Sequence, residues 1–142
     1  MTIFVDTAVV MYAGGAEHPL RSSCRALLGL VASRHVDAVT SAEVIQEILH
    51  RFSRADGVLG DRMARAALEL FGPVLPVTHD VLDRSRRLLT DYPALSARDT
   101  VHVATCIMHG IGHVVSPDVG LDAVREVARI DPTDEQGWRA LP

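Results

Sequence analysis

Four acidic side chains are the candidates for chemistry in this sequence: Asp6, Glu47, Asp99 and Asp118. Asp6 lies near the middle of the apolar stretch TIFVDTAVVMY, and the other three fall in separate parts of the chain. Carboxylates that converge from separate elements repel one another strongly unless a cation neutralises them. Oxygen-only ligands suit a hard divalent ion such as Mg²⁺ or Mn²⁺. Such an ion can activate a water molecule and stabilise the oxyanions of a phosphodiester displacement.

Each of the three aspartates also has a purely structural explanation. Asp6 suits a helix N-cap, because its carboxylate can accept hydrogen bonds from the free backbone N–H groups of a first turn. Asp118 stands in Ser-Pro-Asp-Val-Gly, a sequence typical of a turn. Asp99 comes three residues after Ser96 at the start of a helical pattern, a spacing that resembles a capping box. Position alone therefore leaves both explanations open.

The helical stretch SAEVIQEILHRFSR carries two acids, Glu43 and Glu47, which share one side of the helix because they are four residues apart. Thr40 and Glu43 have the spacing of a capping box, which gives Glu43 a structural task. Glu47 lies at the margin of the apolar stripe, where its carboxylate would point into a cleft. Its structural alternative is a surface ion pair with Arg51. We favour Glu47 as the functional acid.

The charge balance excludes several mechanisms. A net charge of −4 argues against broad nucleic-acid binding through bulk charge, although it does not exclude a local basic patch. All 14 residues counted as Lys or Arg are Arg, so lysine-dependent mechanisms are excluded, including that of haloacid-dehalogenase-like phosphatases. Arg can grip phosphates through its planar guanidinium group. Arg98, beside Asp99, is the better candidate for a phosphate contact, whereas the cluster formed by Arg84, Arg86 and Arg87 is interpreted as a solvated helix face.

The length of 142 residues is most simply one domain, residues 1–142. No apolar run reaches the roughly 20 residues that span a bilayer. The N-terminus lacks the basic segment of a signal peptide, because Asp6 precedes any Arg. We therefore expect a cytoplasmic protein without membrane association. Cys24 and Cys106 lie in apolar helical patterns and are expected to be buried free thiols.

Two further residues attract attention without a clear chemical assignment. His102 follows Asp99 by three residues on the same side of a predicted helix. We expect it to have a surface or cleft-edge role rather than to act as a ligand or proton carrier. Trp138 is expected to pack either against the fold or against a partner subunit.

Short β-branched runs alternate with longer helical patterns along the chain. Strands are predicted at 2–5, 36–40, 74–78, 113–116 and, as a short edge strand, 128–131. Helices are predicted at 18–35, 41–54, 61–71, 79–92 and 97–110, with a turn and a short helix at 117–127. This alternation favours a parallel α/β sandwich with helices on both faces. Ligand sites of such sheets lie beyond the carboxyl ends of the strands, where Asp6 and Asp118 are expected.

Four segments in order resemble the motifs of PIN-domain ribonucleases, and within them the VapC toxins of type II toxin–antitoxin pairs. The segments are FVDTAVVMYA, TSAEVIQEILHRF, SARDTVHVATCIMHGI and HVVSPDVGLDAV, which carry Asp6, Glu47, Asp99 and Asp118 in the acidic positions. Asp122 is a weaker candidate in the fourth segment. The resemblance covers nearly the whole chain, and it implies a PIN-like three-layer α/β/α sandwich around a parallel sheet, usually as a homodimer.

The resemblance also implies an endoribonuclease that depends on Mg²⁺ or Mn²⁺ and acts on structured RNA such as tRNA or ribosomal RNA. The metal ligands would be Asp6, Asp99 and Asp118, with Thr7 and Arg98 contacting the substrate or a metal-bound water. The implied partner is a VapB-type antitoxin whose C-terminal segment fills the acidic cleft. One departure is Ala8, where the family usually has Asn or Ser. It leaves an alternative open, a weak or inactive PIN-fold module that binds RNA or an antitoxin.

Overall fold

A parallel sheet of four short strands forms the centre of the computed structural model, which describes residues 1–141. The strands are β1 Ile3–Val5, β2 Ala38–Val39, β3 His113–Val115 and β4 Ala128–Ile130, in the order β2-β1-β3-β4. All three side chains of β1 are fully buried. Continuous burial is typical of a parallel strand that is covered on both faces, and it explains why TIFV lacks polar alternation.

The strand order creates a switch point between β1 and β3. From β1 the chain crosses to β2 on one side, and it later returns to β3 and β4 on the other side. Open parallel sheets bind ligands at such a point, outside the carboxyl ends of the strands. Asp6 directly follows β1 and Ser116 directly follows β3, so both stand at this edge.

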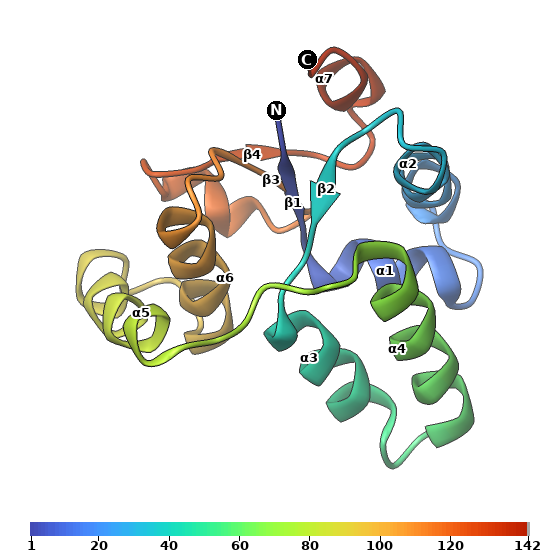
Figure 1. Ribbon diagram of the computed structural model, residues 1–142, viewed down its shortest axis with the longest axis horizontal. Coiled ribbons are helices and arrows are strands. Elements are labelled where there is room, and N and C mark those ends of the chain that lie inside the picture. The colour runs from blue at the N-terminus through green and yellow to red at the C-terminus, as the bar shows by residue number, and fades with distance from the viewer. Residues whose placement is uncertain (142) are drawn as a thin grey trace.

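Helices cover both faces of the sheet, which confirms the predicted α/β/α sandwich. Figure 1 shows α5 and α6 on one side of the sheet, α1 and α2 on the other, and α3 with α4 beyond the carboxyl ends of β1 and β2. The helices are α1 Thr7–Gly14, α2 Arg21–Ala32, α3 Ala42–Phe52, α4 Gly57–Phe71, α5 His79–Asp91, α6 Ala97–Met108 and α7 Glu135–Arg139, with a 3₁₀ turn η1 at Val119–Ala123. Among residues 1–141, none of the helices combines the length and apolar character that a membrane crossing requires.

The buried residues of the core settle two of the open questions. Cys24 and Cys106 are buried and unpaired, as predicted. Trp138 packs against the fold: its ring is fully buried, and its indole Nε1 donates to the carbonyl of Pro132 at 2.9 Å.

The predicted strand at 74–78 is wrong. This segment makes only an isolated parallel bridge between Leu75 and Ser41. The Leu75 N–H donates to the Thr40 carbonyl at 2.9 Å, and its own carbonyl accepts from the Ala42 N–H at 2.8 Å. The ladder stops there because the partner segment turns into helix α3 directly after Ser41.

Several helix starts also differ from the prediction. Helix α2 begins at Arg21, three residues later than predicted. The capping box at Thr40 is wrong, because the N-cap of α3 is Ser41, which accepts from the Val44 N–H at 3.4 Å. Thr40 is instead buried, and its hydroxyl donates to the Val5 carbonyl at 2.8 Å. Helix α4 begins four residues earlier than predicted, at Gly57, because Asp56 caps it by accepting from the Leu59 N–H at 3.0 Å.

Candidate active site

Asp6 is the buried centre of the candidate site. It is only 8% exposed, and both of its carboxylate oxygens accept hydrogen bonds. Oδ1 accepts from the Thr7 N–H at 2.7 Å, which caps α1, and Oδ2 accepts from the Ser116 hydroxyl at 2.6 Å. Burial raises the pKa of Asp6, and the opposing influence of His102 and these hydrogen bonds does not cancel the rise. Asp6 is thus both a helix cap and a desolvated carboxylate, so the structural explanation does not displace the functional one.

His102 joins Asp6 to Glu47. Its Nε2 is 2.7 Å from Glu47 Oε1 and 3.5 Å from Asp6 Oδ1, although the three residues come from α6, α3 and the end of β1. The expected surface or cleft-edge role of His102 is wrong, because the residue is only 4% exposed. The structural alternative for Glu47 was also wrong, since its ionic partner is this imidazole and not Arg51.

The pKa shifts of Glu47 and His102 favour a charged pair. Burial acts to raise the pKa of Glu47, but the hydrogen bond and charge of His102, aided by Thr7 and Arg98, outweigh it and lower the pKa. Burial acts to lower the pKa of His102, but the Glu47 hydrogen bond and the charges of Asp6, Glu47 and Asp99 raise it overall. Each shift favours the ionised form of its group, a carboxylate and an imidazolium in contact.

Asp99 is occupied by its own helix start. Ser96 caps α6 by accepting from the Asp99 N–H at 3.1 Å, and Asp99 Oδ2 accepts from the Ser96 N–H at 3.2 Å. The capping box suggested by the sequence is therefore confirmed. Asp99 is half-buried and near enough to His102 to raise the pKa of the imidazole. The residue before it, Arg98, is exposed.

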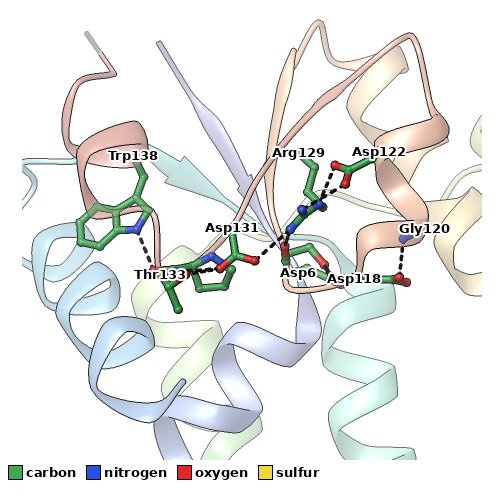
Figure 2. A network of polar contacts seen from close by, with 10 residues as sticks. Asp6, Asp118, Gly120, Asp122, Arg129, Asp131, Thr133 and Trp138 are labelled. Atoms are coloured by element: carbon green, nitrogen blue, oxygen red, sulfur yellow. Dashed lines mark hydrogen bonds and ion pairs between the residues drawn. The ribbon is translucent and has the colours of Figure 1, made fainter. Parts of the chain in front are cut away.

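Asp118 likewise bonds to neighbouring backbone. It caps η1, and its Oδ1 accepts from the Gly120 N–H at 2.9 Å (Figure 2). Its own N–H donates to the Ser116 hydroxyl oxygen at 3.1 Å. Ser116 is fully buried and so links Asp6 to Asp118 through one oxygen. Sequence reasoning missed this residue, and its place at the end of a predicted strand was the signal that could have found it.

Arg129 on β4 holds the loop that carries Asp118. Its guanidinium donates to both oxygens of Asp122, at 2.8 and 3.2 Å, to Asp131 at 3.2 Å and to the Ser116 carbonyl at 2.9 Å. Figure 2 shows Arg129 between these two aspartates. The hydrogen bond from Arg129 lowers the pKa of Asp122. Asp122 therefore serves as a partner of Arg129 in this arrangement.

The donor chemistry of the site fits a hard divalent cation. Within residues 1–141, no three Asp, Glu, His or Cys side chains form a ready-made metal group, and Asp99 and Asp118 bond to local backbone instead. Mg²⁺ usually keeps several waters and binds only one or two carboxylates directly, so three preformed ligands are not required. Thr7 Oγ1 is buried and near enough to Glu47 to help lower the pKa of that carboxylate, but among residues 1–141 it has no partner at normal hydrogen-bond geometry. A water held by a cation would satisfy this hydroxyl.

Comparison with known proteins places this geometry in a family. The PIN domain model matches residues 3–127. Ribonuclease VapC7 of Mycobacterium tuberculosis (strain ATCC 25618 / H37Rv) is 35% identical over 144 residues, which cover 98% of this chain and 97% of the relative.

Solved structures show the same fold. The crystal structure of Mycobacterium tuberculosis VapC20, a sarcin–ricin loop cleaving toxin, matches with a TM-score of 0.69 at 26% identity and covers 88% of this chain and 96% of that one. VapBC2 from Rickettsia felis, bound to a DNA fragment from their promoter, matches with a TM-score of 0.73 over 92% of this chain and 98% of that one; at 14% identity it shows the fold alone. The chain belongs to the PIN-domain family, among the VapC ribonucleases.

Proposed function

We propose that this chain is the toxin of a type II toxin–antitoxin pair and that it hydrolyses RNA phosphodiester bonds as an endoribonuclease dependent on Mg²⁺ or Mn²⁺. The observation that carries the proposal is the meeting of Asp6 and Glu47 at one edge of the sheet. A half-buried carboxylate, Glu47, and a buried one, Asp6, come from separate elements and face the same imidazole, 2.7 and 3.5 Å from its Nε2. Family membership supplies the ribonuclease activity that such an acidic centre would serve.

Asp6, Asp99 and Asp118 would hold the cation, and Glu47 would orient a water among them. When bound, the cation supplies a more acidic water and charge stabilisation for the phosphorane-like oxyanions of the displacement. Asp6 is fixed by two hydrogen bonds, whereas Asp99 and Asp118 would exchange a backbone hydrogen bond for the ion. Arg98, exposed at the start of α6, would contact a phosphate of the RNA.

The partners follow from the same chemistry. A cleft lined by carboxylates would accept a cationic side chain as readily as a metal ion, so a VapB-type antitoxin could block it with an Arg of its C-terminal segment. The VapBC2 structure from Rickettsia felis contains a toxin of the same fold with its antitoxin, which supports this assignment. We propose structured RNA, tRNA or ribosomal RNA, as the substrate and a homodimer as the assembly; the VapC20 toxin is a precedent for an RNA loop as target.

The decisive experiment is cleavage of total RNA by the purified protein with Mn²⁺ or Mg²⁺. Discrete fragments are expected, and they should vanish with EDTA and in the Asp99→Asn variant. Glu47→Gln should also abolish cleavage, whereas the matched Glu43→Gln, one turn earlier on α3, should leave it unchanged. Cleavage that persists with EDTA would overturn metal dependence.

The second candidate is a PIN-fold module that binds RNA or an antitoxin without cleaving. Ala8 favours it, because a methyl group in the first turn of α1 offers no hydrogen bond to the acids beside it. Loss of an outer hydrogen-bond partner weakens metal binding or activity by roughly 10–100-fold. Intact RNA under every condition, from folded protein free of antitoxin, would favour this candidate over the nuclease.

A further inference from the structure

His102 is the buried polar group that the proposed function leaves unused. It lies on α6 one helical turn after Asp99, with its ring centroid 5.6 Å from that of Phe4 on β1. Its Nε2 contacts Glu47 at 2.7 Å, while its Nδ1 is buried and has no hydrogen-bond partner in the described chain. A histidine buried at this depth with one bonded and one orphaned nitrogen needs an explanation.

We infer that His102 is a positioning residue that holds Glu47 in the site through the Nε2–H···Oε1 hydrogen bond; the inference rests on the proposed nuclease function. A carboxylate only accepts hydrogen bonds, so Nε2 must be the donor. The bond therefore ties Oε1 of Glu47 to the imidazole of His102.

The position of Glu47 on α3 explains why its side chain needs the hydrogen bond from His102. It stands at the margin of the apolar stripe of α3, and Arg51 follows it by four residues on the same side. Asp6 repels it, because two carboxylates share the edge of the sheet. Without the His102 donor, the Glu47 side chain can rotate toward solvent and Arg51. His102 offsets both tendencies by joining α3 to α6 through Oε1 of Glu47.

Two substitutions separate this role from simple packing. In Gln the amide nitrogen can reach the place of the imidazole Nε2, so His102→Gln keeps a donor for Glu47. In Asn the amide nitrogen reaches only the place of Nδ1, so His102→Asn stays polar but is smaller and loses the bond. A matched control is His113→Asn, because His113 also has a buried, unpartnered Nδ1 but lies at the start of β3, the opposite edge of the sheet.

The test is Mn²⁺ affinity of the full chain by titration calorimetry, with thermal unfolding to confirm that each variant is folded. We expect His102→Asn to bind Mn²⁺ roughly 10–100-fold more weakly, as for other residues that orient metal ligands. His102→Gln should restore most of the affinity, and His113→Asn should bind as the wild type does. In cleavage assays, His102→Asn should lower kcat more than it raises KM for RNA.

Each other outcome has a definite meaning. Undiminished Mn²⁺ affinity in His102→Asn overturns the inference, and so does a loss in His102→Gln equal to that in His102→Asn, which would make the imidazole a ligand itself. A wild-type chain that binds no Mn²⁺ overturns the proposed function, a result distinct from the first two. If His102→Asn fails to fold, ¹⁵N NMR of the wild-type imidazole decides: a proton on Nε2 that shifts in Glu47→Gln supports the inference, and a proton on Nδ1 alone overturns it.

Discussion

The four acids of the candidate site fall into two pairs that differ in how far along the chain their hydrogen-bond partners lie. Asp6 and Glu47 are held by partners far along the chain: Ser116 is 110 residues from Asp6, and His102 is 55 residues from Glu47. Asp99 and Asp118 are held by backbone only three and two residues away, at Ser96 and Gly120. Asp6 also caps α1 locally through the Thr7 N–H, but only the first pair has such tertiary contacts; the second pair is oriented by its own helix starts.

This difference assigns the two pairs different tasks. A carboxylate that folding has already desolvated and fixed between partners is preorganised. The free-energy costs of its desolvation and of its lost side-chain entropy arise during folding and not during ligand binding. A partly exposed carboxylate in a local cap can exchange one hydrogen bond for another at small net cost. We interpret Asp6 and Glu47 as the fixed part of the site, and Asp99 and Asp118 as the part that adapts to a ligand.

The strongest way to test the fixed pair is Asp6→Asn, which should abolish cleavage while stabilising the fold. Asn is also a good N-cap, so α1 keeps its first-turn hydrogen bond. The pKa of Asp6 is raised by burial, so ionising it costs folding free energy. The advantage of the variant should therefore be absent below the ordinary aspartate pKa of 3.8, grow as pH rises through the raised value, and then stay constant, at about 0.5–2 kcal/mol.

Chemical denaturation over a pH series measures this advantage. Asp56→Asn is the matched control, because Asp56 caps α4 in the same way but is exposed and has no burial cost to relieve. A variant that is no more stable than the wild type at any pH would show that the burial of Asp6 is not costly. Retained cleavage would remove Asp6 from the site.

The next largest effect is expected from Ser116→Ala, which breaks the link between the two pairs. Asp6 Oδ2 would lose the hydroxyl donor of Ser116, and the Asp118 N–H would lose its acceptor. Leaving a buried acceptor unsatisfied costs about 1–3 kcal/mol, and the loss of an orienting partner lowers activity roughly 10–100-fold. Ser116→Thr, which keeps the hydroxyl, should recover both.

A second buried hydroxyl provides the control for Ser116. Ser85 Oγ and Thr100 Oγ1 are 2.7 Å apart in a buried pair between α5 and α6. Ser85→Ala should reduce the unfolding free energy, measured by urea denaturation, without changing the cleavage rate. If both serine variants lose stability but neither loses activity, Ser116 contributes only to stability, and the hydrogen bonds that link the acid pairs do not affect cleavage.

The same division explains what could be predicted from the sequence. The capping box at Ser96 and the cap at Asp6 are local patterns, and the sequence indicated both. The carboxyl-edge placement of Asp6 followed from strand and helix alternation. The sequence predicted Thr40 as the N-cap of α3, but the N-cap is Ser41. Thr40 instead donates to the Val5 carbonyl on the neighbouring strand, a contact that exists only in the folded sheet.

The partners of the fixed acids could not be predicted from one sequence. His102 follows Asp99 by three residues on the same side of a helix, and we expected a surface or cleft-edge role for it. Nothing local shows that α3 brings Glu47 against it or that Phe4 lies 5.6 Å from the ring. Ser116 stands at the end of a predicted strand, but its hydrogen bond to Asp6 depends on the parallel pairing of β1 with β3. Long-range contacts of this kind follow from topology rather than from residue type.

The smallest effect should come from Ser96→Ala, which tests whether the local pair can adapt. The variant loses the cap of α6 and should cost about 1 kcal/mol of unfolding free energy, because the Asp99 N–H loses its acceptor. Thr78→Ala is the control: it removes the equivalent cap of α5, a bond of 3.2 Å to the Val81 N–H, at a helix start without a candidate acid. Both should destabilise equally in urea.

Cleavage by Ser96→Ala should stay near the wild-type rate, because Asp99 keeps its carboxylate and is not oriented by the Ser96 hydroxyl. A loss of activity well beyond that of Thr78→Ala would show the opposite, that the cap holds Asp99 in its working orientation. Asp99 would then belong with Asp6 and Glu47 as a preorganised group, and only Asp118 would remain free to move toward a ligand.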